Sequence, residues 1–369
     1  MRRLLICLLI AGLFQPIGSG ASKPKTRTTR KPVASSSKKK PAAKRKRSRA
    51  SAKPLPPVDP TLGDNVDGDD LNIRRAAVEA LGGYNGSVVV VDPRTGRVLT
   101  IVNQKLAYTS GFTPCSTIKL VTALAALSEG IIERDTPIRL SRRTTLNLTS
   151  AIAHSNNPYF AKLGVQLGFD RVTRYARAFG LGEKAGLEIE GEQPGIVPRE
   201  PPKYGGVGMM TSFGEGFQMT PLELASLLSA ISNGGTLYYL QYPRSQQDVD
   251  EFMPRVKRKL EIASWIPDLK VGMRAAVDSG TARRANYDPA EPVLGKTGTC
   301  TDFRASTHMG WFGSFNDVGH NQLVVVVVLT GNHSVNGPVA AGVAGNVYRS
   351  LSQKNYFASV FSTQSCCAQ

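Results

Sequence analysis

Five consecutive valines, Val324–Val328, restrict the possible folds of this chain more than any other feature. β-Branched side chains favour strands. A strand that is apolar at every position must be covered on both of its faces, because its side chains alternate between them. The run therefore predicts a strand over Gln322–Leu329 in a sheet with helices on both sides.

Four other segments have the composition of strands, and they lie on either side of a long middle region. They are Ser87–Val91, Arg97–Val102, Val293–Cys300 and His308–Phe315. Turn residues between the first two predict a hairpin. The middle region, about 136–288, is mostly helical in pattern, and helices are also expected at 71–81 and 339–351. We predict an α/β fold of the α+β type, in which one five-stranded sheet is covered by helices and carries an inserted helical subdomain.

The net charge of +18 comes from the N-terminal part of the chain. Ser22–Lys53 contains fourteen basic residues and no acidic one, and Arg2 and Arg3 add two more. The remaining residues carry 30 basic and 28 acidic side chains. A nearly neutral globular part does not indicate a nucleic-acid-binding protein, so no nucleic-acid partner is expected.

Residues 1–21 have the pattern of a secretory signal peptide. A charged start precedes the apolar run Leu4–Phe14, which is too short for a membrane-spanning helix, and Ser19–Ala21 offers a cleavage site. A short uncleaved membrane anchor is the alternative. Both interpretations place the protein outside the cytoplasm, in the periplasm or associated with the cell envelope.

Residues 22–60 are expected to be a basic disordered linker, because they combine self-repelling charge with Pro, Ser and Ala. Such a tract can contact an anionic membrane or wall polymers. A solvated spacer is an equally good interpretation. The globular domain is then expected over 61–355, followed by a tail at 356–369.

Three short motifs occur in a fixed order along the globular part: Ser116 with Lys119, Ser155 with Asn157, and Lys296–Gly298. Ser116 and Lys119 lie three residues apart at the start of an apolar helix, so they share a face. Burial of the lysine lowers its pKa and makes it a base for the serine hydroxyl. Taken alone, the pair also fits an N-cap serine beside a lysine that extends into solvent.

The other two motifs carry polar groups suited to a peptide substrate. Ser155 is a candidate proton relay and Asn157 a candidate partner for a substrate amide, although Asn157 before Pro158 equally fits a helix N-cap. Lys296 offers a positive charge to a carboxylate. Gly298 allows a ligand to approach the backbone closely.

The order of these motifs is that of penicillin-binding proteins and serine β-lactamases. Four further segments resemble the transpeptidase domains of penicillin-binding proteins: Val88–Leu99, Thr220–Ala225, Ala230–Gly235 and Gly280–Ala282. The resemblance covers roughly residues 70–355. It implies that family's fold, with a mostly antiparallel sheet and an all-helical inserted subdomain. It also implies peptidoglycan stem peptides as substrates and β-lactam antibiotics as acylating inhibitors.

The resemblance also assigns a role to each motif residue. Ser116 becomes the acylated nucleophile and Lys119 its base, with Ser155 and Asn157 as the second catalytic element. In the third motif Lys296, Thr297 and Thr299 bind the terminal carboxylate, and Gly298 is a substrate-binding residue through its close approach to the backbone. The backbone N–H groups of Ser116 and Thr299 form the oxyanion hole.

Several departures from the family pattern limit this interpretation and argue against a bifunctional enzyme and a fast class A β-lactamase. The chain has no room for a glycosyltransferase domain before residue 70, nor for the N-terminal pedestal of many monofunctional relatives. It lacks the glutamate motif that class A β-lactamases use for deacylation. We expect a serine D,D-transpeptidase; a D,D-carboxypeptidase, a β-lactamase and a non-catalytic penicillin-binding sensor or scaffold are the alternatives.

The resemblance further suggests a disulfide between Cys115 and Cys300, since the nucleophile helix abuts the Lys-Thr-Gly strand in this superfamily. Some class A carbapenemases have a bridge at that place. The alternative is two small buried thiols that stay reduced. No metal site or cofactor is expected, and the acidic stretch Asp64–Asp70 lacks the twelfth-position Glu of a calcium loop.

Overall fold

The computed structural model describes residues 59–109, 111–302, 307–317 and 321–358. The predicted leader and the basic tract Ser22–Lys53 lie outside these residues. Among the residues that the structure describes, no helix has the length and apolar character needed to span a membrane.

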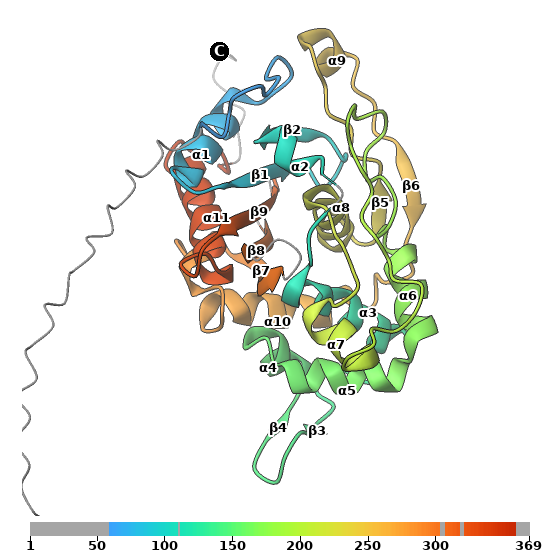
Figure 1. Ribbon diagram of the computed structural model, residues 1–369. Coiled ribbons are helices and arrows are strands. Elements are labelled where there is room, and N and C mark those ends of the chain that lie inside the picture. The colour runs from blue at the N-terminus through green and yellow to red at the C-terminus, as the bar shows by residue number, and fades with distance from the viewer. Residues whose placement is uncertain (1–58, 110, 303–306, 318–320, 359–369) are drawn as a thin grey trace, which may run out of the picture. The chain divides into compact units, whose positions relative to one another are not determined.

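One five-stranded sheet organises the globular part (Figure 1). Its strands are β1 (Gly86–Val91), β2 (Val98–Val102), β7 (Val293–Asp302), β8 (Thr307–Asn316) and β9 (Val324–Gly331), in the order β2-β1-β9-β8-β7. Every neighbouring pair is antiparallel. The sheet confirms the predicted fold class, and it leaves β7 at one edge.

The five valines lie on β9 in the centre of the sheet, between β1 and β8. Val324, Val326 and Val328 belong to one core, while Val325 and Val327 belong to the other. The second core is covered by α1 (Leu71–Leu81) and α11 (Gly337–Ser352). The alternation explains why an unbroken apolar run was required at this position.

The opposite face of the sheet is covered by helices from the middle of the chain. The helix α3 (Lys119–Ser128) is buried from Lys119 to Leu127, which accounts for a sequence that is apolar almost all round. The helix α8 (Pro221–Ser232) packs directly on β1, β8 and β9. Its first turn is fixed by a capping box between Thr220 and Glu223.

The remaining elements belong to the inserted region or to the segment of chain that leads into it. They are α2 (Gln104–Ala107), η1 (Cys115–Ile118), β3 (Ile138–Arg139), β4 (Thr145–Leu146), α4 (Leu148–Ala153), α5 (Asn157–Leu167), α6 (Phe169–Ala178), α7 (Gly206–Phe213), β5 (Thr236–Tyr238), α9 (Gln246–Asp250), β6 (Val256–Lys259), α10 (Ile266–Asp278) and η2 (Arg283–Ala285).

The inserted region differs from the all-helical subdomain that the resemblance implied. It contains two small antiparallel pairs, β3 with β4 and β5 with β6. Strands of two to four residues have too short a pattern for a period-2 signal, so the sequence did not reveal them. The region also includes α8 and α10, which pack against the main sheet.

Candidate active site

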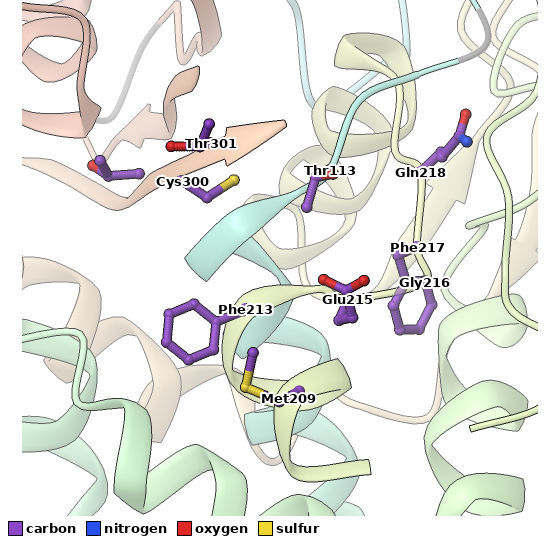
Figure 2. Close-up of a pocket in the computed structure, with 10 residues that line it drawn as sticks. Thr113, Met209, Phe213, Glu215, Gly216, Phe217, Gln218, Cys300 and Thr301 are labelled. Atoms are coloured by element: carbon purple, nitrogen blue, oxygen red, sulfur yellow. The ribbon is translucent and has the colours of Figure 1, made fainter. Parts of the chain in front are cut away.

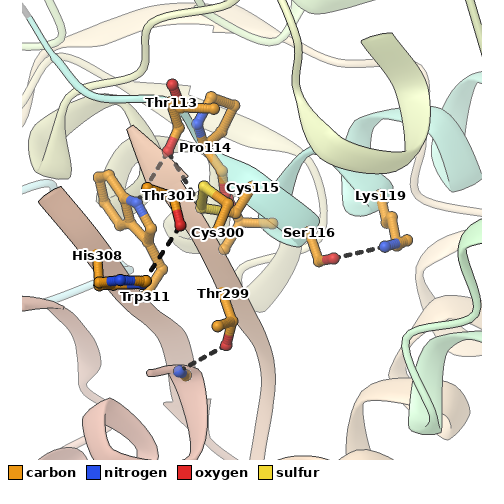
Figure 3. The surroundings of a disulfide bond; sticks show 12 residues. Thr113, Pro114, Cys115, Ser116, Lys119, Thr299, Cys300, Thr301, His308 and Trp311 are labelled. Carbon is orange, nitrogen blue, oxygen red and sulfur yellow. Dashed lines mark hydrogen bonds between the residues drawn. A yellow bond between two sulfur atoms is a disulfide. The ribbon is translucent and has the colours of Figure 1, made fainter. Parts of the chain in front are cut away.

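Ser116 and Lys119 lie where the chain enters the buried helix of the inserted region. Ser116 is in the single turn η1, and Lys119 is the first residue of α3. One turn of separation brings Lys119 Nζ to 2.5 Å from Ser116 Oγ (Figure 3). The side chain of Lys119 is fully buried, so the structure excludes the alternative of a lysine that extends into solvent.

Burial favours the neutral form of Lys119. Its amine also lies 5.7 Å from the ring centroid of Phe160 and 6.0 Å from that of Phe213, and these two ring faces by themselves favour the ammonium form. Because burial withdraws the ammonium group from water and so disfavours the charged form, the pKa of Lys119 is lowered to about 7. At neutral pH a large fraction of this amine is therefore able to accept the proton of the Ser116 hydroxyl.

Ser155 and Asn157 come from the tight connection between α4 and α5. The N-cap of α5 is Asn156, whose side chain accepts the N–H of Tyr159 at 2.9 Å. Asn157, the residue predicted as the alternative cap, is instead the first residue of the helix. Its side-chain oxygen accepts a hydrogen bond from Lys119 Nζ at 2.7 Å. The capping interpretation of Asn157 was therefore wrong.

Ser155 links the two lysines of the site. It has a left-handed backbone conformation, with φ of 54°, which a non-glycine residue adopts at an energetic cost. Its hydroxyl lies 2.8 Å from Nζ of Lys296 and 3.4 Å from Nζ of Lys119. A chain of polar atoms thus runs from Ser116 through Lys119 and Ser155 to Lys296.

Lys296 is fully buried on the edge strand β7. Its amine also donates to the carbonyl oxygen of Thr297 at 2.9 Å. Burial, and then the positive charge of Lys119, lower the pKa of Lys296 well below the usual value for a lysine. No carboxylate of a described residue lies within ion-pair distance of either amine, so the site is suited to an incoming anion.

The strand β7 approaches the nucleophile turn because Gly298 has no side chain. A Cβ at this position would lie 3.0 Å from the carbonyl oxygen of Pro114 and 3.2 Å from Cγ2 of Thr117. Opposite Gly298 on β8 is Trp311, whose indole N–H donates to the Thr113 carbonyl at 3.1 Å. These contacts hold the segment before Ser116 against the strand.

The two threonines of the third motif have different surroundings. Thr297 is buried, and its hydroxyl lies 2.6 Å from that of Thr281. Thr299 is exposed and accepts the N–H of Gly337 at 2.8 Å. Thr281 had not been identified as a site residue, although it belongs to the Gly280–Ala282 segment that carries part of the family resemblance. Only the fold brings it beside β7.

A disulfide joins Cys115 to Cys300, with their α-carbons 5.5 Å apart (Figure 3). The structure thus contains the expected bridge between the residue before Ser116 and the strand β7. Cys115 has φ of 52°, a second left-handed residue beside the site. In the described part of the chain, no group of three or more His, Cys, Asp or Glu side chains is arranged to hold a metal ion.

A cavity of about 460 Å³ lies beside the disulfide (Figure 2). One wall is the end of β7, from Thr299 to Thr301. The other wall is the end of α7 and the loop that follows it, including Phe213, Glu215 and Phe217. Since Thr299 lines this cavity, the cavity adjoins the part of β7 that carries the third motif.

A family model, the penicillin-binding protein transpeptidase domain, matches residues 86–349. Among curated proteins, the chain is 30% identical over 283 residues to "Stage V sporulation protein D" of Bacillus subtilis. This match covers 68% of this chain and 43% of that protein. The chain is also 25% identical over 304 residues to "Peptidoglycan D,D-transpeptidase MrdA" of Acinetobacter baumannii, a match that covers 65% of this chain and 45% of that protein. The chain thus spans less than half the length of these relatives.

The fold is similar to that of a solved structure, the D,D-transpeptidase domain of a peptidoglycan glycosyltransferase from Eggerthella lenta. The match has a TM-score of 0.60 at 22% identity, and it covers 77% of this chain and 82% of the other. At this identity the likeness supports the arrangement of elements alone.

Proposed function

This chain belongs to the penicillin-binding protein transpeptidase family, and we propose that it is a serine D,D-transpeptidase that cross-links peptidoglycan stem peptides through an acyl-enzyme on Ser116. The observation that carries the proposal is the 2.5 Å contact between Ser116 Oγ and the buried amine of Lys119. A hydroxyl beside a neutral amine is an activated nucleophile.

In the acylation step, Ser116 Oγ attacks the carbonyl carbon of the penultimate residue of a stem peptide that ends in D-Ala-D-Ala. Lys119 takes the hydroxyl proton, and the backbone N–H groups of Ser116 and Thr299 stabilise the negative oxygen. Collapse of this intermediate breaks the peptide bond. The leaving amine of the terminal D-Ala receives a proton through Ser155, and an ester on Ser116 remains.

The terminal carboxylate of the donor is bound by Lys296, with the hydroxyl groups of Thr297 and Thr299 close by. Two supports for this role are the burial of Lys296 and the lack of a carboxylate partner among the described residues. Asn157 orients Lys119 and binds the substrate amide. In the second step the amine of a neighbouring stem peptide attacks the ester carbonyl. A new amide bond forms, the bond to Ser116 Oγ breaks, and a proton from the amine returns to the serine oxygen.

The same proposal places the chain outside the cytoplasm, with residues 1–21 as leader or anchor. β-Lactams would acylate Ser116 as mimics of the donor peptide. The basic tract Ser22–Lys53 would hold the domain near anionic lipids or wall polymers by charge alone.

The test is the reaction of the full chain with a labelled penicillin, followed by intact-mass measurement. A long-lived adduct on Ser116 is expected, and it should be absent in Ser116→Ala with an unchanged circular-dichroism spectrum. Rapid release of hydrolysed drug would indicate a β-lactamase, and no adduct would indicate a non-catalytic protein. A donor peptide with an added D-amino acid then separates transpeptidation from hydrolysis by a carboxypeptidase.

A further inference from the structure

The small hairpin of β3 and β4 carries a concentration of positive charge. Residues 136–169 include four Lys or Arg side chains and no Asp or Glu, although the opposite charges of the globular part nearly balance. All four basic residues are exposed. Three lie on the hairpin and one lies on the neighbouring helix α5: Arg139, Arg142, Arg143 and Lys162. We refer to these four residues as the basic surface.

The basic surface has no acidic partner in the described part of the chain. None of its four side chains forms an ion pair with a described residue, and the nearest carboxylate along the chain, that of Asp135, is paired with Arg134. Lys162 Nζ donates instead to the carbonyl oxygen of Arg139 at 3.2 Å, which ties α5 to the hairpin. Like charges without a counter-charge repel one another, so this arrangement favours an anionic partner.

The hairpin projects from the inserted region beside α4 and α5 (Figure 1). Its strands contribute only two residues each, and the residues from Ser141 to Thr145 are all exposed. A two-stranded hairpin of this size buries too little surface to be stable alone. The exposed tip therefore offers its arginines to a second molecule and contributes little to the core.

The basic surface is also close to the candidate active site along two elements. The helix α4, six residues long, separates the hairpin from Ser155, a distance of about 9 Å along its axis. On α5, Lys162 follows Asn157 by five residues, or about 7.5 Å. A ligand with several connected units can therefore occupy the basic surface and the active site together.

The side chains of the basic surface suit a linear polyanion better than a folded protein. Protein interfaces depend on aromatic or other large side chains at their centre, and no residue of the hairpin is an exposed large hydrophobic one. Guanidinium groups bind carboxylates with paired hydrogen bonds. A peptidoglycan strand with several stem peptides presents a row of carboxylates on the same polymer that enters the active site.

We propose that the basic surface is an exosite for the stem-peptide carboxylates of a peptidoglycan strand, and that it holds neighbouring peptides while one of them reacts at Ser116. The inference rests on the proposed transpeptidase function and extends it from a single peptide to a polymer. Each exposed ion pair contributes little, but several carboxylates on one strand bind together.

The test measures binding of the full chain to an oligomeric strand with several D-Ala-D-Ala stem peptides, and to one soluble stem peptide. The double variant Arg142→Gln, Arg143→Gln should bind the strand about three- to tenfold more weakly at low salt and the single peptide equally well. A few hundred millimolar salt should remove the difference. The charge-conserving variant Arg142→Lys, Arg143→Lys should retain most of the affinity for the strand.

A matched control, Arg75→Gln with Arg349→Gln, removes two exposed charges from α1 and α11 and should bind the strand as the wild type does. The basic tract is present in every variant, so its contribution is the same in each. Penicillin should acylate all variants at the wild-type rate, because none of these residues belongs to the candidate active site.

Equal affinity of the glutamine double variant and the control for the strand overturns the inference. A loss of binding to anionic lipid vesicles without a loss of binding to the strand also overturns it, and would assign the basic surface to a membrane. Wild type with no penicillin adduct on Ser116 would instead refute the proposed function, so the two failures are distinguishable.

Discussion

The side-chain oxygen of Asn157 accepts a 2.7 Å hydrogen bond from Lys119 Nζ, across the interface between α5 and α3. Asn157 is therefore directed into the site instead of along its own helix. The side chain of the neighbouring residue Asn156 instead caps α5 by accepting the backbone N–H of Tyr159. Two adjacent residues of the same type thus have separable tasks.

We expect Asn157→Ala to slow acylation by penicillin while changing stability little beyond the lost hydrogen bond. Asn156→Ala is the matched control, and it should lower the free energy of unfolding by about 1 kcal/mol through loss of the cap while acylation proceeds. Urea unfolding and stopped-flow acylation measure the two effects. An equal loss of acylation in both variants would contradict the division of tasks.

The rate of acylation should depend on pH through Lys119. The neutral amine is the active form, and burial lowers its pKa to about 7. The rate constant should therefore fall about tenfold per unit below pH 7 and become constant above about pH 8. Lys119→Ala should reduce the acylation rate constant by roughly 10²–10⁴-fold, and the fall in rate below pH 7 should disappear. A flat profile in the wild type from pH 5 to 9 would refute Lys119 as the base.

Loss of the Cys115–Cys300 disulfide should destabilise the domain. The bridge spans 185 residues, and loop entropy alone gives an upper figure of about 4–5 kcal/mol. Urea unfolding of Cys300→Ala against the oxidised wild type measures it. Treatment of the wild type with a thiol reductant should lower the free energy of unfolding by the same amount. The same reductant should leave the free energy of unfolding of Cys300→Ala unchanged. Alkylatable thiols at both positions in exported protein would show that the bridge does not form there.

Deletion of residues 22–53 should leave penicillin acylation unchanged and abolish association with vesicles of anionic lipid. Binding of the full chain should weaken steeply with salt and vanish at a few hundred millimolar, where the Debye length is below about 8 Å. Co-sedimentation at a series of salt concentrations measures this. Binding that persists at high salt would indicate an apolar contact in place of the charge.

The sequence predicted the five main strands from local signals, and it predicted the residues that meet at the site from the order of three motifs and their resemblance to penicillin-binding proteins. The valine run needs two covered faces, and Ser116 with Lys119 needs only one helical turn. Assignment of the cap to Asn156 was not decided locally, since Asn156 and Asn157 are equally good capping residues. The contact of Thr281 with Thr297 and the position of Glu215 depend on packing between distant segments, which no short pattern encodes.

The two buried amines also determine what happens to protons when a substrate arrives. In the free protein, burial and the nearby Lys119 charge make Lys296 much easier to deprotonate than an ordinary lysine. A carboxylate bound beside Lys296 would stabilise the ammonium form and raise that pKa again. At pH values above the lowered pKa of Lys296, binding should therefore draw a proton from solution. Calorimetry of Ser116→Ala with a penicillin in buffers of different ionisation enthalpy would report this uptake, and the affinity should decline as the pH rises.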